Sequence, residues 1–319
     1  MLSRVAESIY WINRYVERAE NYARFLSVNI NLSLDAPGLF TEQWEPILTA
    51  TADNEAFHVY YDKATRENVI NFLTIDDRNP NSVYSCLAAA RENARTIRES
   101  LPKELWEHLN GFYIKVKNAQ YAQSRIAENP LIFCEEIKLG CQLFWGIIDS
   151  TVTRNEGFHF GRLGKFLERA DKTSRFLDVQ YFTVLPESEA VGSPKELLIW
   201  SAVLKSVSAF NMYRQQYKTL TPSQIIKFLI LDKNFPRSIL YSIRRAEMSL
   251  YEISGIKMVD GYSNGAERAI SRMRYDIEFT DINDILDESL HSYLDNFQIS
   301  NNQIGQAVFD TYFALKQVD

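Results

Sequence analysis

The feature that most constrains the fold is an internal repeat. Seven of fifteen positions are identical between residues 14–28 (RYVERAENYARFLSV) and residues 165–179 (KFLERADKTSRFLDV). Chance gives about one identity in such a window, and four further pairs keep the same chemistry. The chain is therefore expected to contain two diverged copies of one unit.

Paired landmarks outside this segment repeat at an offset of 156 positions. They are Trp44 with Trp200, Phe72 with Phe228, Asp76 with Asp232, Pro80 with Pro236 and Ser82 with Ser238. We therefore assign residues 1–150 to the first copy and residues 151–319 to the second, within one continuous globular unit. The shift in offset from 151 to 156 is expected to come from the loop 186–194, since the first copy has only a short turn around 37–38 there.

Apolar residues recur at helical spacing in both copies. The stripes are Ile9, Ile12, Val16, Ala19, Ala23, Leu26 and Ile30 in the first copy, and Phe160, Leu163, Leu167, Ala170, Ser174 and Leu177 in the second. Capping boxes predict that helices begin after Ser193, Thr221 and Ser300. Since no clear strand alternation is present, we predict an all-α helical bundle of about ten to twelve helices, with a pseudo-twofold relation between the halves.

Charge and composition narrow the classes of partner. The 35 Lys and Arg residues are balanced by 41 Asp and Glu residues, without a basic tract that would neutralise phosphates, which argues against nucleic acid. The charged N-terminal stretch lacks the apolar core of a signal peptide, and no segment reaches the roughly 18 apolar residues of a membrane span. We expect a cytoplasmic protein without a membrane partner, and three cysteines without a CxxC pair fit a reducing compartment.

A charged stripe runs beside the apolar stripe in each motif. Its members are Arg14, Glu17, Arg18, Asn21 and Arg24 in the first copy, and Lys165, Glu168, Arg169, Lys172 and Arg175 in the second. Glu20 and Asp171, which follow the Glu-Arg-Ala sequence of each motif, are further candidates for binding a ligand or a partner. The plain interpretation is a salt-bridge lattice that holds the helices in register. Because the pattern is repeated, we also consider that Glu17 and Glu168 converge at the interface between the halves. With Arg18 and Arg169 they would form a mixed-charge pocket suited to a carboxylate or amide ligand.

A second basic stripe is formed by Arg91, Arg95 and Arg98, and the second copy matches it only by Arg244 and Arg245 nearby. An arginine row without an equal acidic row is a candidate surface for an anion or a partner. A solvated helix face is the commoner origin of such a row.

Two signatures of catalysis or metal binding are present but weak. Ser263 lies in a Gly-x-Ser-x-Gly sequence, yet a nucleophile elbow needs a strand-to-helix turn, and flanking glycines ordinarily mark a loop. The Glu-x-x-His pairs Glu156 with His159 and Glu288 with His291 have the spacing of a carboxylate di-iron bundle. They occupy non-equivalent places in the repeat, so no metal is expected. Motifs for nucleotide, dinucleotide or zincin chemistry are lacking, and no cofactor is expected.

Several blocks of the sequence resemble bacterial alpha-E proteins. They are residues 1–20 (MLSRVAESIYWINRYVERAE), 79–82 (NPNS), 90–95 (ARENAR), 161–171 (GRLGKFLERAD) and 235–238 (FPRS), the last containing Arg237. The resemblance implies an all-helical protein found beside circularly permuted ATP-grasp ligases, transglutaminase-like proteins and sometimes a proteasome-like peptidase. It implies a part in peptide or amide-bond synthesis or modification, and it brings no established catalytic residue.

Three functions follow from these observations. The first is an accessory or substrate-handling subunit of an ATP-grasp peptide or amide ligase system. Its expected partners are a circularly permuted ATP-grasp protein and a transglutaminase-like protein, and its expected ligand is a peptide or an amino acid. The second is an enzyme that modifies a peptide with Glu17 or Glu168 as general base. A general base needs a carboxyl pKa raised toward neutrality, whereas the neighbouring arginines lower the pKa of these glutamates. The third is a structural homo-oligomer.

Overall fold

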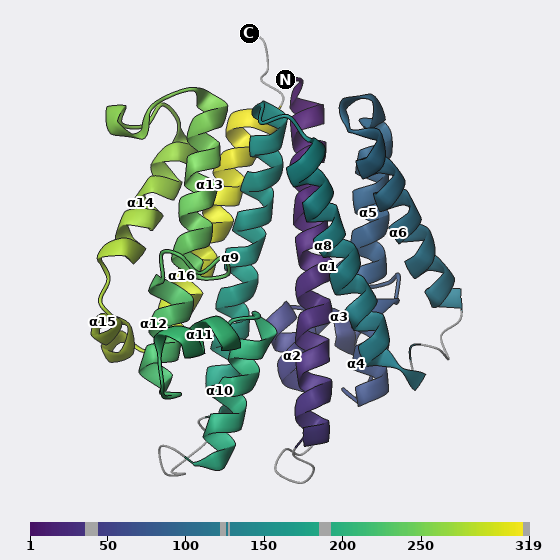
Figure 1. The fold of residues 1–319 in the computed structure, drawn as a ribbon, viewed down its shortest axis with the longest axis vertical. Coiled ribbons are helices and arrows are strands. Elements are labelled where there is room, and N and C mark those ends of the chain that lie inside the picture. The colour runs from purple at the N-terminus through teal and green to yellow at the C-terminus, as the bar shows by residue number, and fades with distance from the viewer. Residues whose placement is uncertain (36–43, 122–125, 127, 185–192, 315–319) are drawn as a thin grey trace.

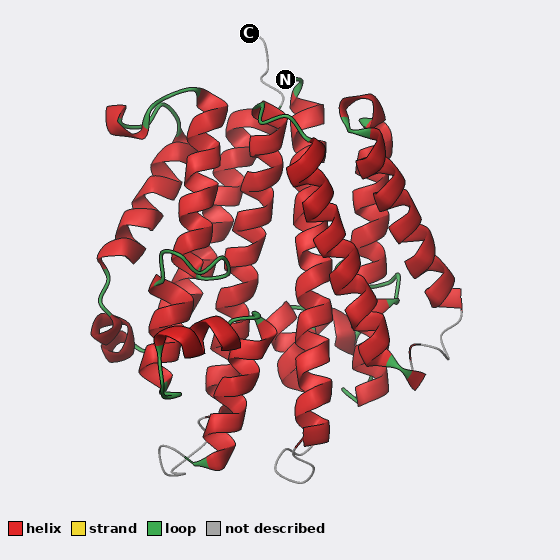
Figure 2. Cartoon of the chain, in the orientation of Figure 1, coloured by secondary structure: helices red, strands yellow, loops and turns green. Residues whose placement is uncertain are grey.

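The computed structural model describes residues 1–35, 44–121, 126, 128–184 and 193–314, and these residues form helices and connecting loops without a strand (Figure 2). The α-helices are α1 (Ser3–Asp35), α2 (Glu45–Thr51), α3 (Asn54–His58), α4 (Arg66–Thr74), α5 (Val83–Thr96), α6 (Lys103–Tyr121), α8 (Pro130–Thr151), α9 (Glu156–Val184), α10 (Pro194–Ser206), α11 (Phe210–Gln216), α12 (Pro222–Leu231), α13 (Ile239–Ser254), α14 (Gly265–Phe279), α15 (Ile282–Glu288) and α16 (Leu290–Val308). The all-α prediction is confirmed.

The number of helices exceeds the ten to twelve that were expected, since the described part of the chain alone contains fifteen. Four of them, α2, α3, α11 and α15, have seven residues or fewer. Helices of two turns or less leave no periodic pattern in a sequence.

The two longest helices, α1 and α9, run side by side through the middle of the molecule (Figure 1). Helices α3 to α6 and α8 lie mainly on the side of α1, and α11 to α16 lie mainly on the side of α9. The predicted apolar stripes face the core, since all their residues are buried except Ile9, which is half-buried. One large apolar cluster fills each side, and the stacked rings of Phe25 and Phe176 join α1 to α9, with centroids 4.0 Å apart.

Small residues allow α1 and α9 to approach closely. A Cβ added at Gly164 would lie 2.5 Å from the backbone oxygen of Tyr10, and one added at Gly161 would lie 2.6 Å from the side-chain nitrogen of Asn13. An amide side chain can turn away, but a helix backbone cannot. Glycine at position 164 is therefore needed for the distance between the two central helices.

Several paired landmarks have the same local role in both halves. Trp44 and Trp200 are both buried. Ser82 and Ser238 are the N-cap residues of α5 and α13, and each hydroxyl accepts from a backbone N–H at 3.1 Å. The proposed length difference at 37–38 and 186–194 falls mostly outside the described residues.

The predicted helix starts have different outcomes. Ser193 caps α10, as its hydroxyl accepts from the backbone N–H of Glu196 at 3.2 Å. Thr221 precedes α12 without a side-chain cap bond. The start at Ser300 is wrong, because that residue lies inside α16, whose buried stripe continues from Phe297 to Ile304. Burial of this stripe outweighs a local capping pattern.

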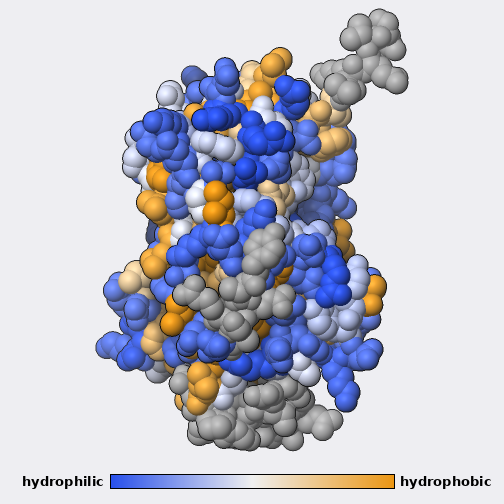
Figure 3. Space-filling view, turned by 90° about the vertical axis from the view of Figure 1, so that its right-hand side faces the viewer, coloured by the Kyte–Doolittle hydropathy of each residue, from blue (hydrophilic) through white to orange (hydrophobic). Residues whose placement is uncertain are grey.

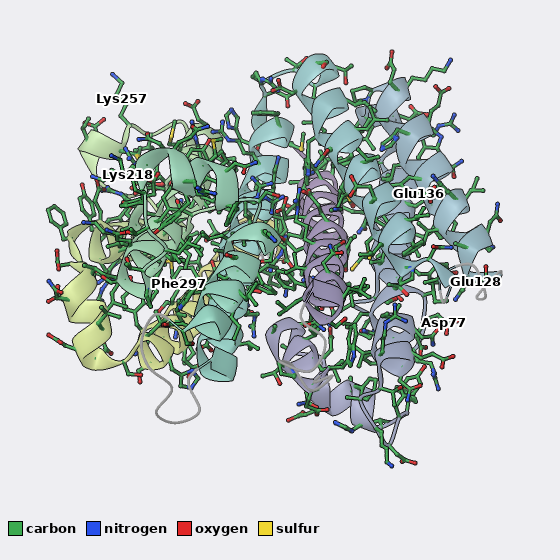
Figure 4. All side chains as sticks on the ribbon, turned by 60° about the horizontal axis from the view of Figure 1, so that its bottom comes forward. Asp77, Glu128, Glu136, Lys218, Lys257 and Phe297 are labelled. Atoms are coloured by element: carbon green, nitrogen blue, oxygen red, sulfur yellow. The ribbon has the colours of Figure 1, made fainter. Side chains whose placement is uncertain are left out.

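The outer surface is mainly hydrophilic on the side where α6 lies, with apolar residues in small separate patches (Figure 3). Seen from the lower end, the two sides of the bundle carry charged residues outward, among them Glu136 on one side and Lys218 on the other (Figure 4). None of the helices in the described ranges combines the length and apolar character that crossing a membrane requires.

Candidate functional site

The charged stripes of α1 and α9 meet at the seam between these helices. Glu168 of α9 is fully buried and accepts from two arginines of α1, from Arg14 Nε at 2.9 Å and from Arg18 Nε at 2.7 Å. In the opposite direction, Glu17 of α1 is fully buried and accepts from Arg169 through two bonds of 2.8 Å. Each glutamate therefore binds the arginine that follows the other glutamate.

A second layer of acidic residues extends this network. Glu20 accepts from Arg24 at 2.6 Å, and it also pairs with Arg237, which lies just before α13. At the equivalent position of the second motif, Asp171 accepts from Arg175 at 3.0 Å. These acidic residues are thus neutralised by arginines and are enclosed by the helices.

The arginines hold the carboxyl groups ionised. Burial alone raises the pKa of Glu17 and of Glu168, but the attraction of Arg169 and Arg237 for the first, and of Arg18 and Arg14 for the second, more than offsets burial and leaves both pKa values lowered. Burial likewise raises the pKa of Glu20, yet its arginines bring it down to about 2. The expected convergence of the two motifs is found, but as a closed network of ion pairs. A general base, with a pKa near neutrality, is not what these glutamates provide.

A cavity of about 980 Å³ opens beside this network, between α1, α8, α9 and α13 near the α8–α9 connection. Its lining combines basic side chains with aromatic walls, namely Arg154, Arg162, Lys165 and Arg245 with Phe144, Trp145, Phe158, Phe166 and Tyr241. Asp149 also lines it, and its carboxylate is paired with Arg154 at 2.6 Å. The cavity therefore carries a net positive charge.

Two of these arginines are without a carboxylate partner among the described residues. Arg162 lies over the ring of Phe166, and Arg245 lies over the ring of Tyr241 at 4.9 Å from its centroid. Burial, followed by the like charge of Arg245, lowers the pKa of Arg162. An anion bound between the two guanidinium groups would relieve this repulsion.

Lys165 is the cationic residue of the cavity that lies nearest to the ion-pair network. Its Nζ lies 3.8 Å from the ring centroid of Trp145, whose indole N–H donates to Glu20 at 2.9 Å. Among the described residues Lys165 forms no ion pair. Burial, followed by the charge of Arg169, lowers its pKa to about 7, so that a large fraction of this amine is neutral near physiological pH.

His159 adds a polar group at the cavity wall. Its Nδ1 is buried and has no hydrogen-bond partner in the described part of the chain. Burial lowers the pKa of this imidazole, which favours the neutral ring.

The remaining candidates from the sequence lie elsewhere. Arg91 donates to Asn110 at 2.7 Å and pairs with Glu92, and Arg95 donates to Glu92 at 2.8 Å. Glu92, which lies between Arg91 and Arg95 in the sequence, thus partly neutralises the arginine row on the surface. None of the three arginines of this row lines the cavity.

The two Glu-x-x-His pairs are not brought together. Glu156 accepts from the Met1 amino group at 2.7 Å, and His291 contacts Asp178 at 2.9 Å, while Glu288 ends the short helix α15. Within the described residues no three potential ligands form a metal-binding group. Ser263 lies in the loop before α14 and donates to Glu267 at 3.0 Å, in a helical environment without a nucleophile elbow.

The sequence did not predict the cavity or the lowered pKa of Lys165. The signal available was the difference between the two similar segments at this position, since Lys165 aligns with Arg14. From the sequence Arg237 is a candidate for binding a ligand or a partner, whereas the structure makes it a main partner of the ion-pair network.

Comparison with known proteins agrees with the all-helical architecture. Residues 1–313 match the family model Alpha-E, which is described as a predicted alpha-helical domain with a conserved ER motif. This chain contains Glu-Arg dipeptides at 17–18, 168–169 and 267–268.

Curated relatives are similar over most of the chain. The uncharacterized proteins Mb2597 of Mycobacterium bovis and Rv2567 of Mycobacterium tuberculosis are each 22% identical over 292 residues, which is 85% of this chain and 31% of the relative. The chain thus spans less than a third of the length of these relatives. No solved structure matches it.

Proposed function

The chain belongs to the Alpha-E family, and from this premise we propose that it is a substrate-handling subunit of an ATP-grasp peptide or amide ligase system. In this proposal the cavity between α1, α8, α9 and α13 binds a peptide or an amino acid through its carboxylate. The observation that carries the proposal is the pair Arg162 and Arg245, two half-buried cations that line the cavity and have no carboxylate partner among the described residues.

The size and the walls of the cavity suit such a ligand. A volume of about 980 Å³ is at the upper end of the range for small-molecule sites, which is roughly 300–1,000 Å³. Arginine pairs bind carboxylates with directed hydrogen bonds, and aromatic walls accept apolar side chains. The ligase partner rests on the family resemblance alone, and a cytoplasmic location follows from the same proposal.

Binding is favoured over catalysis by Glu17 or Glu168 because these carboxylates are enclosed and fully paired. To act as a general base, one of the glutamates would have to give up its ion pairs with two arginines. Breaking ion pairs around a buried carboxylate costs free energy, because the separated charges are left without partners.

The reciprocal ion pairs also support a further part of the proposal, namely that residues 1–150 and 151–319 are diverged copies related by a pseudo-twofold axis. Under a twofold relation, if residue i of the first copy contacts residue j of the second, then residue j of the first copy contacts residue i of the second. Glu17 with Arg169 and Glu168 with Arg18 follow this rule.

A homo-oligomeric interaction protein is the second candidate, and one observation favours it. Ile132, Leu139 and Leu143 of α8 are each more than half exposed and share one helix face. Light scattering on the purified chain at high concentration checks this candidate, and a monomer would exclude it.

The substrate-handling proposal is tested by ATP turnover of a circularly permuted ATP-grasp protein from the same organism, with a pool of amino acids as substrates. We expect the full chain to increase turnover and to copurify with the ligase. The variant Arg162→Gln with Arg245→Gln should lower the apparent affinity for the amino acid at least about tenfold, the loss expected for charged hydrogen bonds. Arg272→Gln, on the exposed face of α14 and away from the candidate sites, is the matched control and should behave like the wild type. If neither a complex nor stimulation is found, the proposal is wrong.

A further inference from the structure

The two copies use different residues to satisfy their buried glutamates. Glu168 binds Arg18 and Arg14, both from α1. Glu17 binds Arg169 and, at 3.3 Å, Arg237. The position in the second copy that corresponds to Arg14 is Lys165, and it takes no part in these pairs.

Arg237 explains why Lys165 is left out. By the offset of the later landmarks, Arg237 corresponds to Asn81 of the first copy. The neutral Asn81 side chain accepts from Arg18 at 2.6 Å and donates to Asp53 at 2.9 Å, so it brings no cation to the network. In the second copy the arginine in this place supplies the second cation for Glu17. A lysine at position 165 is therefore not needed for charge balance, and its amine is placed in the cavity above Trp145.

Charged groups face Lys165 from several elements. Glu17 and Glu20 of α1 favour its protonated form, whereas Arg169 of its own helix and Arg237 before α13 oppose it. Both glutamates are already paired with arginines. Burial and the surrounding arginines therefore dominate and lower the pKa of Lys165 to about 7. An amine with this pKa has enough of its neutral form near pH 7 to act as a nucleophile.

We propose that Lys165 forms a reversible imine with a 2-oxo acid bound in the cavity, with Arg162 and Arg245 holding the carboxylate of that acid. This inference rests on the cavity of the proposed function and names a substrate class for it. The aromatic walls favour a 2-oxo acid with an aromatic or apolar side chain, because such a side chain can pack against Phe158, Phe166 or Tyr241.

The chemistry balances without a further reactant. The lone pair of Lys165 Nζ attacks the carbonyl carbon, and a C–N bond forms as the carbonyl π-bond opens to a carbinolamine. The carbinolamine oxygen then leaves as water with the two protons lost from nitrogen, and a C=N bond remains. Hydrolysis reverses these steps, and nothing is oxidised or reduced.

The test is reductive trapping on the full chain. The protein is incubated with phenylpyruvate at pH 7, treated with sodium borohydride, digested, and analysed by mass spectrometry. We expect saturable addition at Lys165 that exceeds addition at Lys172 at least tenfold. Lys172 is the matched control, since it is buried in the same helix but is paired with Asp171 at 3.1 Å. Trapping at Lys165 no greater than at exposed lysines would overturn the proposal.

A second ligand separates this inference from the proposed function. Phenyllactate has the same carboxylate and ring but no keto group, and its binding can be followed by isothermal titration calorimetry. We expect Lys165→Met to keep phenyllactate binding within about threefold and to lose trapping completely, which would support both proposals. Phenyllactate binding without trapping in the wild type would overturn the imine alone. Absence of both binding and trapping would overturn the cavity as a carboxylate site as well.

Discussion

Replacing Glu168 by glutamine tests whether the buried network stabilises the fold. The side chain is fully buried and neutralises Arg14 and Arg18, with Lys172 Nζ at 3.8 Å. Glutamine keeps the size but not the charge, so it leaves these largely buried cations without their counter-charge. Breaking a buried pair in this way costs about 3–5 kcal/mol. That is a large part of the roughly 5–15 kcal/mol by which a domain is stable.

The assay is urea unfolding of the full chain followed by circular dichroism, with Glu92→Gln as the matched control. Glu92 also pairs with two arginines, Arg91 and Arg95, but its side chain is 51% exposed. Exposed pairs contribute about 0–1 kcal/mol. If Glu168→Gln lowers the free energy of unfolding by no more than the control does, the network is not a major source of stability and our reasoning is refuted.

The pH dependence of the same variant is an independent check. The pKa of Glu168 is lowered from its ordinary value of 4.5, so its contribution is complete above the pKa of the unfolded chain and is lost as pH falls below about 4.5. In this acid range the unfolded state binds more protons than the folded state. The stability of Glu168→Gln should therefore fall less steeply between pH 5 and pH 3 than that of the wild type.

Two further predictions concern the central helices and the cavity. Gly164→Ala should lower the free energy of unfolding by about 1–3 kcal/mol, because the new Cβ meets the backbone oxygen of Tyr10. Gly111→Ala has open space and should stabilise by up to about 1 kcal/mol in the same urea unfolding assay; equal effects would contradict the packing argument. The pKa of Lys165 is lowered from 10.5 to about 7, so wild-type stability should rise with pH between about 7 and 10.5, where the unfolded state binds more protons. Lys165→Met should remove this rise and stabilise the protein by about 1–3 kcal/mol at pH 6.5, a partial share of the full shift because the amine borders the cavity; an unchanged pH profile would show that the amine is not desolvated.

The sequence predicts the helical class and the two central helices well, because long apolar stripes at helical spacing have one interpretation. It also predicts which charged residues meet, since Glu17 and Glu168 are repeated together with their arginines. It fails at Ser300, where a local capping pattern competes with a buried face that only packing reveals. Short helices such as α3 are not predicted, because they have too few residues to show a periodic pattern.

The lowered pKa of Lys165 cannot be predicted from the local sequence, because it depends on residues far away in the chain. Its amine lies above Trp145 from α8, and the glutamate it would otherwise pair with is bound by Arg237 from the segment before α13. Neither contact has a spacing signal in the sequence. The cavity itself requires α1, α6, α8, α9 and α13 to be placed, and no single segment specifies it.

The Glu-Arg motif and the cavity depend on each other through the register of α1 against α9. A shift of one helix by a turn would separate Glu17 from Arg169 and Glu168 from Arg18, and the two fully buried glutamates would lose these partners. Such a state is strongly disfavoured, so the motif fixes a single register. That register places Lys165 next to Trp145, and Glu20 holds the indole N–H of Trp145 while it binds Arg237. The motif thus acts by positioning, and the groups left free to react or bind are those that the network does not use.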